Sequence, residues 1–229
     1  MIEWVFLDLD DTIYDFHKAE TVAIKETLAH FSIEPTEKTV KRYSEINKMM
    51  WERLERGEAT RDEVLIMRFT ILFSELGLDI KGEVARVIYE NNLKRTHFLM
   101  PGAMELLSAL KGRYKLYLAS NGTAHVQDGR IAAGNIAKYF DDIFISHKIG
   151  YNKPSIEYFN ACFERIPGFK KERAIIVGDS LSSDILGGKN AGILTCRYNP
   201  NGKDGCENII PDYEIRNLSE LPKLLEAIK

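Results

Sequence analysis

The chain has 229 residues, of which 45% are hydrophobic, and its formal net charge at pH 7 is −3. This length and apolar content suffice for one sizeable hydrophobic core and a smaller second bundle. The mild charge, without a Lys/Arg block or interleaved aromatic residues, argues against binding to a nucleic acid polymer.

The N-terminal segment combines a buried strand with two closely spaced carboxylates. Residues 4–9 are almost entirely apolar and predict a strand, with Asp8 near its C-terminal end. An unpaired ionised carboxylate is costly there, so such residues commonly hold a metal or take part in a reaction. Because side chains two residues apart lie on the same side of a strand, Asp8 and Asp10 can share one substrate. One of them can attack while the other moves protons, provided that a nearby cation keeps the first ionised.

Two other interpretations of this segment stay open at this point. The run Asp10-Asp11-Thr12 also suits a strand exit or a helix N-cap. An EF-hand calcium loop alternates its ligands in the same way, but Ile13 stands where that loop requires glycine. The EF-hand is therefore the weaker competitor.

The segment that follows predicts a helical bundle. Apolar residues recur at three- and four-residue spacings over four stretches, which are 20–31, 36–55, 60–76 and 80–94. Thr36 and Thr60 are suited to cap the second and third of these helices. An insert of about eighty residues has the size of a small domain. We expect a helical domain at 16–96, hinged near 15–18 and 96–102, and a core formed by 1–15 and 97–229.

Polar loops follow the next two apolar strands. Residues 115–119 precede Ser120 and Asn121, whose loop offers a hydroxyl and backbone N–H groups to an anion. Residues 143–146 precede Lys153, which lies just before a predicted helix. A lysine at this position could neutralise a phosphoryl oxygen.

Two further acids follow another apolar strand. Residues 173–177 lead into Asp179 and Asp184, which lie five positions apart across a strand exit and a helix start. Together with Asp8 they could form the oxygen-lined site that Mg²⁺ prefers. Each polar segment alone has an ordinary explanation as a turn or a cap. In this order, each after its own strand, they favour a common function.

The overall fold is predicted to be α/β. A fifth apolar strand covers 193–197, and an amphipathic helix covers 218–228. Five strands that are mostly followed by helices predict a doubly wound parallel sheet with the first strand near its centre.

Cysteine usage and hydropathy bear on location. Cys162, Cys196 and Cys206 are odd in number and widely spaced, which fits a reducing cytosol and argues against structural zinc. No apolar run approaches membrane-spanning length. We therefore expect a cytoplasmic protein without a membrane partner.

Taken in order, the polar segments resemble the four motifs of the haloacid-dehalogenase-like (HAD) phosphohydrolase superfamily. Asp8-x-Asp10-x-Thr12 is similar to the first motif, Ser120 to the second, Lys153 to the third, and Gly178-Asp179 with Asp184 to the fourth. The resemblance implies a Rossmann-like core and identifies the helical insert as a cap over the active site. Closure of such a cap excludes water and lets cap residues select the substrate.

The resemblance also implies catalytic roles. Asp8 would be the nucleophile that forms an aspartyl-phosphate, and Asp10 would protonate the leaving oxygen and later deprotonate the attacking water. Lys153 would offset the negative charge of the phosphoryl group. Phosphoryl transfer asks mainly for positioning and electrostatic stabilisation, so these roles agree with the chemistry of the residues.

The remaining matched residues would bind the substrate and the metal. Thr12, Ser120 and the backbone around Asn121 would hold the phosphoryl oxygens. The Mg²⁺ ion would be held by Asp8, Asp179 and the backbone carbonyl of Asp10. Asp184 would orient Lys153 or metal-bound water.

Asp10 bears on the type of reaction. Superfamily members that dehalogenate carbon or cleave phosphonates lack the second acid of the first motif, so Asp10 favours phosphate esters. A phosphomutase, which would return the phosphoryl group to a sugar, is a less favoured alternative. A non-catalytic binding protein would normally have lost Asp8, Asp10 or Lys153.

A closer resemblance concerns the substrate. Residues 47–51, 53–58 and 190–196 resemble the bacterial pyrimidine 5′-nucleotidases that act on modified nucleoside monophosphates. This resemblance implies a pyrimidine or non-standard nucleoside monophosphate, with Trp51 stacking on the base and Asn47 bonding its edge. A Trp in a helical apolar stripe is more often part of a core. The main alternative is a phosphatase for phosphoglycolate or a sugar phosphate, which would differ only in its cap.

Overall fold

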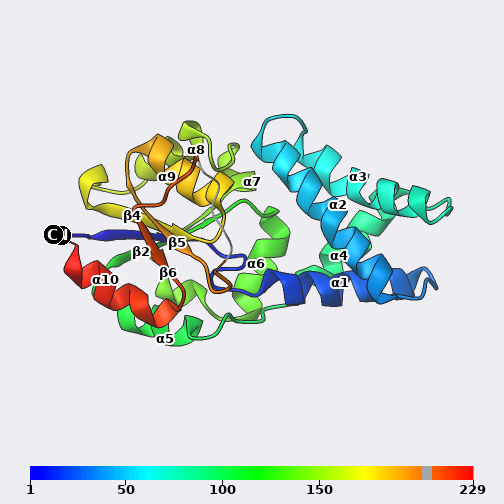
Figure 1. Ribbon diagram of the computed structural model, residues 1–229, viewed down its shortest axis with the longest axis horizontal. Helices are drawn as coiled ribbons and strands as arrows, with labels where there is room; N and C mark the ends of the chain where they lie inside the picture. Colours follow the sequence, from blue (N-terminus) through cyan, green and yellow to red (C-terminus); the bar gives the residue numbers. More distant parts are fainter. Residues whose placement is uncertain (203–207, 229) are drawn as a thin grey trace.

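The computed structural model describes residues 1–202 and 208–228. Within these residues a six-stranded parallel sheet has the order β3-β2-β1-β4-β5-β6 (Figure 1). Its strands are β1 (Trp4–Leu7), β2 (Lys115–Ser120), β3 (Asp142–Ile145), β4 (Ala174–Gly178), β5 (Leu194–Tyr198) and β6 (Tyr213–Ile215). The predicted α/β fold with a parallel sheet and a central first strand is confirmed.

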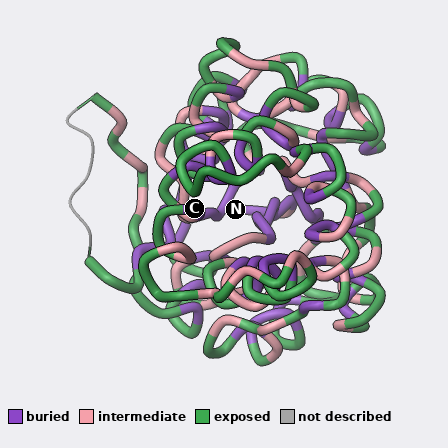
Figure 2. The backbone as a smooth tube through the Cα atoms, turned by 90° about the vertical axis from the view of Figure 1, so that its right-hand side faces the viewer, coloured by how far each residue is buried: buried purple, intermediate pink, exposed green. Residues whose placement is uncertain are grey.

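Strand β1 is apolar throughout because both of its faces are covered. Leu7 lies beside Leu118 of β2 and Val177 of β4, and it packs with α5 (Ala103–Leu110) and α10 (Leu221–Ala227) on one face. Phe6 points to the other face, where α8 (Ile156–Phe163) and α9 (Leu186–Ala191) cover the sheet. Figure 2 shows that the buried positions gather inside the molecule. This two-sided burial is typical of parallel sheets.

The sequence analysis missed β6. This strand has only three residues and pairs with β5 at the edge of the sheet, where Tyr213 lies beside Cys196. Edge strands are often this short, and three residues do not establish a periodicity. The predicted C-terminal helix is divided into η4 (Leu218–Glu220) and α10.

Four helices form a second bundle beside the sheet, at the other end of the long axis in Figure 1. They are α1 (Phe16–His30), α2 (Glu37–Glu55), α3 (Arg61–Glu75) and α4 (Gly82–Leu93), and we call them the cap. Tyr43, Phe69 and Tyr89 are part of the hydrophobic core within this bundle. Helices α2 and α3 begin at the predicted N-caps, Thr36 and Thr60, whereas α1 begins four residues before its predicted start.

Two chain segments join the cap to the rest of the protein, which we call the core. They run side by side, because Asp15 N donates to Phe98 O at 2.8 Å and Met100 N donates to Ile13 O at 2.9 Å. The predicted hinges near 15–18 and 96–102 fall on these connecting segments and stay a prediction. The boundaries at residues 16 and 97 stay a prediction.

The core also contains further helices, which lie in the connections between the strands. They are α6 (Ala124–Ala133), η1 (Ala137–Tyr139), α7 (Ser146–Ile149), η2 (Lys171–Arg173) and η3 (Leu181–Ile185). Across residues 1–202 and 208–228, no helix has both the length and the apolar character needed to cross a membrane. Cys162 and Cys196 are buried free thiols, and Cys206 lies outside the described residues.

Candidate active site

A cavity of about 760 Å³ lies between the C-terminal ends of the central strands and the cap. Nine of the ten predicted site residues line it, namely Asp8, Asp10, Asn47, Trp51, Ser120, Asn121, Lys153, Asp179 and Asp184. The exception is Thr12, which is fully buried and whose Oγ1 has no hydrogen-bond partner among the described residues. The topology explains the gathering, since the C-terminal ends of parallel strands meet at one edge of the sheet.

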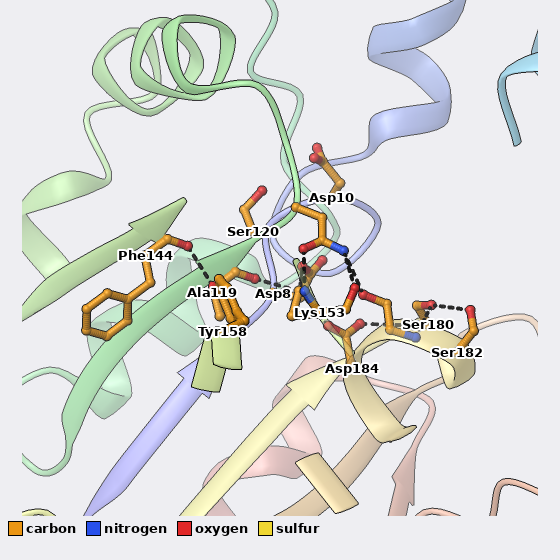
Figure 3. Close-up of polar contacts among 12 residues, drawn as sticks. Asp8, Asp10, Ala119, Ser120, Phe144, Lys153, Tyr158, Ser180, Ser182 and Asp184 are labelled. Carbon is orange, nitrogen blue, oxygen red and sulfur yellow. Dashed lines mark hydrogen bonds and ion pairs between the residues drawn. The ribbon is translucent and has the colours of Figure 1, made fainter. Parts of the chain in front are cut away.

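Lys153 lies between two carboxylates at the centre of this site (Figure 3). Its Nζ donates to Asp8 Oδ1 and to Asp184 Oδ1, each at 2.6 Å, and to the carbonyl oxygen of Ala119 at 2.7 Å. Burial lowers the pKa of Lys153, but the neighbouring Asp184 and Asp8 outweigh it and the net pKa is raised. The lysine is therefore a fixed positive charge beside Asp8.

Three carboxylates of the site crowd together. Asp8, Asp179 and Asp184 each offer an oxygen atom, and these atoms all lie within 4.8 Å of one another. Burial raises the pKa of Asp8 and of Asp179 well above the usual range, and the neighbouring carboxylates add to both shifts. Lys153 opposes these shifts without cancelling them. Hard oxygen ligands with excess negative charge are what Mg²⁺ requires, so the donor set fits this ion.

The fourth-motif loop fixes the orientation of Asp184. Its Oδ1 faces Lys153, and its Oδ2 accepts a hydrogen bond from the backbone N–H of Ser180 at 3.1 Å. Ser180 also caps η3, with its Oγ accepting from Ser183 N at 3.1 Å. Asp184 thus contacts Lys153 directly, and its orienting role stays a prediction.

Two residues of α6 hold the carboxylate of Asp10. Gln127 Nε2 donates to Asp10 Oδ2 at 2.7 Å and to Ser120 Oγ at 2.9 Å, and Arg130 Nη1 donates to Asp10 Oδ1. Arg130 is fully buried, and its Nε donates to the carbonyl oxygen of Thr96 at 3.2 Å. Asp10 therefore projects into the cavity from a fixed position that is separate from the Lys153 pair.

The side chain of Asn121 holds the backbone of Lys153. Its Nδ2 donates to Lys153 O, and its Oδ1 accepts from Lys153 N, both at 2.9 Å. This pair of bonds joins the loop after β2 to the loop that carries Lys153. The same Nδ2 also donates to Ser183 Oγ at 3.2 Å, so the side chain of Asn121 is engaged and the predicted contact with an anion falls to the backbone of its loop.

The cap contributes a buried polar network to the same cavity. Asn47 Nδ2 donates to Glu20 Oε1 at 2.7 Å, and Asn47 Oδ1 accepts from Arg68 Nη1 at 2.8 Å. Ser44 Oγ donates to the other oxygen of Glu20 at 2.6 Å. Burial raises the pKa of Glu20, although the bonds from Ser44 and Asn47 oppose that rise. Trp51 is half-buried, packs against the cap core and also lines the cavity.

A family model described as a haloacid dehalogenase-like hydrolase matches residues 2–192. The chain belongs to the haloacid dehalogenase-like hydrolases. The prediction that it is an enzyme of the HAD superfamily is confirmed, and the four motif segments fall within the matched residues.

Several HAD relatives match nearly the whole chain. The HAD-hydrolase YfnB of Bacillus subtilis is 41% identical, covering 96% of this chain and 94% of YfnB. A crystal structure of YfnB bound to magnesium has a TM-score of 0.94 and covers 98% of both chains. The pyrimidine 5′-nucleotidase PynA of Streptococcus pneumoniae is 34% identical, with 98% and 95% covered. A glyceraldehyde 3-phosphate phosphatase of Methanothermobacter thermautotrophicus is 29% identical, with 87% and 86% covered.

Sequence reasoning missed four residues of this HAD site, namely Glu20, Arg68, Gln127 and Arg130. Gln127 and Arg130 lie three positions apart on the helix that follows the Ser120 loop, so they share one helix face. This three-residue spacing was the one feature of the sequence that could have indicated Gln127 and Arg130 as site residues. Glu20 and Arg68 lie in amphipathic helices whose polar residues are usually exposed, and only the packing of the cap reveals that both are buried.

Proposed function

We propose that this protein is a Mg²⁺-dependent phosphomonoesterase that works through an aspartyl-phosphate on Asp8. The observation that carries the proposal is the placement of Asp8 in the cavity, beside the buried ammonium of Lys153 at 2.6 Å and among carboxylates that suit a divalent cation. When bound, Mg²⁺ would add positive charge that stabilises the transferring phosphoryl group. Asp8, Asp179 and Asp184 would hold it, with the backbone carbonyl of Asp10.

The first step breaks the ester bond. A carboxylate oxygen of Asp8 attacks phosphorus, and the leaving oxygen takes a proton from Asp10. Lys153 and the donors around Ser120 offset the phosphoryl charge as the bond to Asp8 forms.

The second step breaks the aspartyl-phosphate. Asp10, now ionised, takes a proton from a water molecule, which attacks phosphorus and releases phosphate from Asp8. Arg130 and Gln127 donate to the two oxygens of Asp10 and so hold its carboxylate in place for this step. The two steps together turn a phosphomonoester and water into an alcohol and inorganic phosphate.

The proposed substrate is a pyrimidine or non-standard nucleoside monophosphate. Support comes from the cap half of the cavity, where Trp51 and Leu65 offer apolar surface and Asn47 offers an amide edge. Such a lining suits a flat ring with polar edge atoms, and a volume of about 760 Å³ lies in the range of small-molecule sites. The similarity to PynA agrees with this choice. A triose phosphate, which the Methanothermobacter relative suggests, would leave the cap half largely empty.

The test is phosphate release with Mg²⁺ from a substrate panel, with Asp8→Asn as the blank. The panel contains dUMP, dTMP, UMP, a halogenated dUMP, AMP, phosphoglycolate, glyceraldehyde 3-phosphate and hexose phosphates. Preference for pyrimidine monophosphates would support the proposal, and preference for a small phosphate would overturn its substrate. Release by Asp8→Asn at the normal rate would overturn the nucleophile, and isomerisation of a hexose 1-phosphate without phosphate release would indicate a mutase.

A further inference from the structure

Arg61 is a cap residue whose guanidinium contacts the core. It is the first residue of α3, yet its Nη1 donates to the carbonyl oxygen of Asn121 at 2.8 Å. Its Nη2 donates to Ser146 Oγ at 2.6 Å and also to Asn152 Oδ1. These acceptors belong to the segments after β2 and β3. One side chain of the cap thus bridges two loops of the core.

The three acceptors of Arg61 are all neutral, although the side chain is partly buried. Burial lowers the pKa of Arg61 to about 10, and the nearby Asp62 only partly opposes this shift. Hydrogen bonds from a cation are stronger than those between neutral groups, and a planar guanidinium can serve several acceptors at once. The position of Arg61 is therefore defined by the loops that it bridges.

The cap supports Arg61 from its own side. Trp51 of α2 lies behind the guanidinium, with 5.7 Å between the Arg61 Cζ atom and the indole ring. Thr60, which immediately precedes Arg61, caps α3. Trp51 lines the cavity, whereas Arg61 is not among the described residues that do. Arg61 thus acts from outside the space that a substrate would fill.

The contacts of Arg61 continue to Asp8 through two residues. Arg61 holds the backbone of Asn121, and the side chain of Asn121 holds the backbone N–H and carbonyl of Lys153. Lys153 Nζ in turn contacts Asp8 at 2.6 Å. This series of bonds runs from the cap to the proposed nucleophile without passing through a substrate.

We propose that Arg61 is a positioning residue, which aligns Lys153 with Asp8 when the cap is seated on the core. The inference rests on the proposed function, in which Asp8 and Lys153 react with a phosphoryl group. It gives cap closure a second effect besides excluding water, because a seated cap completes the geometry of Lys153. An open cap withdraws the guanidinium and leaves the Asn121 loop without this support.

A second cap contact separates this role from simple attachment. Ser182 Oγ, in the fourth-motif loop, donates to Glu55 Oε2 at the end of α2 at 2.7 Å. The Glu55 contact lies at a different loop of the site and remains when Arg61 is replaced. Loss of Arg61 therefore tests the alignment of Lys153 more than the attachment of the cap.

The first experiment measures kcat and KM of Arg61→Ala and Arg61→Lys, with Arg42→Ala as the matched control. Arg42 is also a cap arginine, but it pairs with Glu75 at 2.7 Å and Glu45 at 3.1 Å on the cap surface. We expect Arg61→Ala to lower kcat by up to about a hundredfold, since small misplacements of reacting groups have effects of this size. The kcat of Arg61→Lys should lie between those of Arg61→Ala and the wild type, because an ammonium keeps the charge but cannot serve three acceptors as a planar guanidinium does. Arg42→Ala should keep the normal kcat.

The second experiment measures hydrogen exchange at the Lys153 amide, which donates to Asn121 Oδ1. Exchange in a peptide that contains Lys153 should be faster in Arg61→Ala than in the wild type and in Arg42→Ala. This readout needs no substrate, so it decides the inference even if the proposed substrate is wrong. Thermal unfolding shows whether Arg61→Ala is folded. If it is not, Arg61→Lys is used for both the kinetics and the hydrogen exchange.

Two results would overturn the inference. One is exchange in Arg61→Ala equal to that in Arg42→Ala, whether or not kcat falls. The other is a rise in KM with kcat unchanged, which would make Arg61 a residue of substrate binding. If the wild type hydrolyses only a non-nucleotide ester, kcat is measured on that ester, and the proposed substrate alone fails.

Discussion

Gly178 lies against the carboxylate of Asp184, so closely that a Cβ at position 178 would come within 2.1 Å of Asp184 Oδ2. The same oxygen accepts the backbone N–H of Ser180, and the other oxygen accepts the ammonium of Lys153. The end of β4 can approach the carboxylate only because it has no side chain there. A glycine at this point is therefore part of the geometry around Lys153.

Gly178→Ala should displace Asp184 and with it Lys153. We expect kcat to fall by about a hundredfold, the effect of misplacing a reacting group by roughly an ångström. Gly168→Ala is the control, because Gly168 has φ +69°, has open space around it and is not among the described residues that line the cavity. That change should lower the free energy of unfolding by about 1 kcal/mol and leave kcat normal. Steady-state kinetics and thermal unfolding of both variants test this, and equal kcat values would refute it.

Gln127→Leu removes the amide that joins Asp10 to Ser120 while keeping a side chain of similar size. A hydrogen bond to a charged group contributes about 1.5–3 kcal/mol, so we expect kcat to fall by roughly ten- to a hundredfold. The control is Asp128→Asn on the same helix, where Asp128 pairs with Lys148 at 2.7 Å on the surface. A normal kcat in Gln127→Leu would show that Asp10 does not need the hydrogen bond from Gln127.

Magnesium should raise the melting temperature of the wild type. A ligand at a hundred times its Kd stabilises the folded state by about 2.7 kcal/mol, and Asp179→Asn should lose most of this effect. Lowering the pH should weaken it too, because protons compete for Asp8 and Asp179, whose pKa values are raised. Without metal the dependence on pH is the opposite. The free energy of unfolding should fall as the pH rises from the usual carboxyl range to the raised pKa values of Asp8 and Asp179, because over this range the folded state holds protons that the unfolded state has released. Thermal unfolding with Mg²⁺ or EDTA at several pH values measures both trends, and an undiminished Mg²⁺ shift in Asp179→Asn would contradict the assignment.

The sequence was sufficient to predict the site wherever a residue directly follows an apolar strand. Asp8 and Asp179 come just after a strand and Ser120 is the last residue of one, and parallel strands bring such positions to one edge. Arg130 and Gln127 could not be found in this way. They meet Asp10 across 120 and 117 positions of sequence, and their own helix has no motif.

The cap shows more clearly that contacts between helices could not be predicted from the sequence. Its four helices were predictable from apolar spacing, and Asn47 was singled out as a contact for a base. The bonds of Asn47 to Glu20 and Arg68 depend on how α1, α2 and α3 pack, which periodicity does not determine. The contact between Arg61 and Asn121 depends in addition on how the cap sits on the core.

Asn47→Ala should impair hydrolysis of nucleoside monophosphates more than that of small phosphate esters. The amide of Asn47 has a fixed orientation, because Arg68 only donates hydrogen bonds and so must face the amide oxygen, which leaves the amide nitrogen facing Glu20. It can therefore present one donor and acceptor pattern to the edge of a base. We expect KM for the preferred nucleotide to rise by about tenfold, equivalent to one hydrogen bond of about 1.4 kcal/mol. For phosphoglycolate, which does not reach the cap network, KM should stay close to normal.

The stability of this variant separates recognition from folding. Asn47→Ala leaves the buried Glu20 and Arg68 without their shared partner, which should lower the free energy of unfolding by about 1–3 kcal/mol. Met49→Ala, a change at a more exposed position of the same helix, is the control for both measurements. If Asn47→Ala loses activity equally on nucleotides and on phosphoglycolate, its effect comes from the fold of the cap. A loss confined to nucleotides places the base against the network, because the chemistry at Asp8 is the same for both esters.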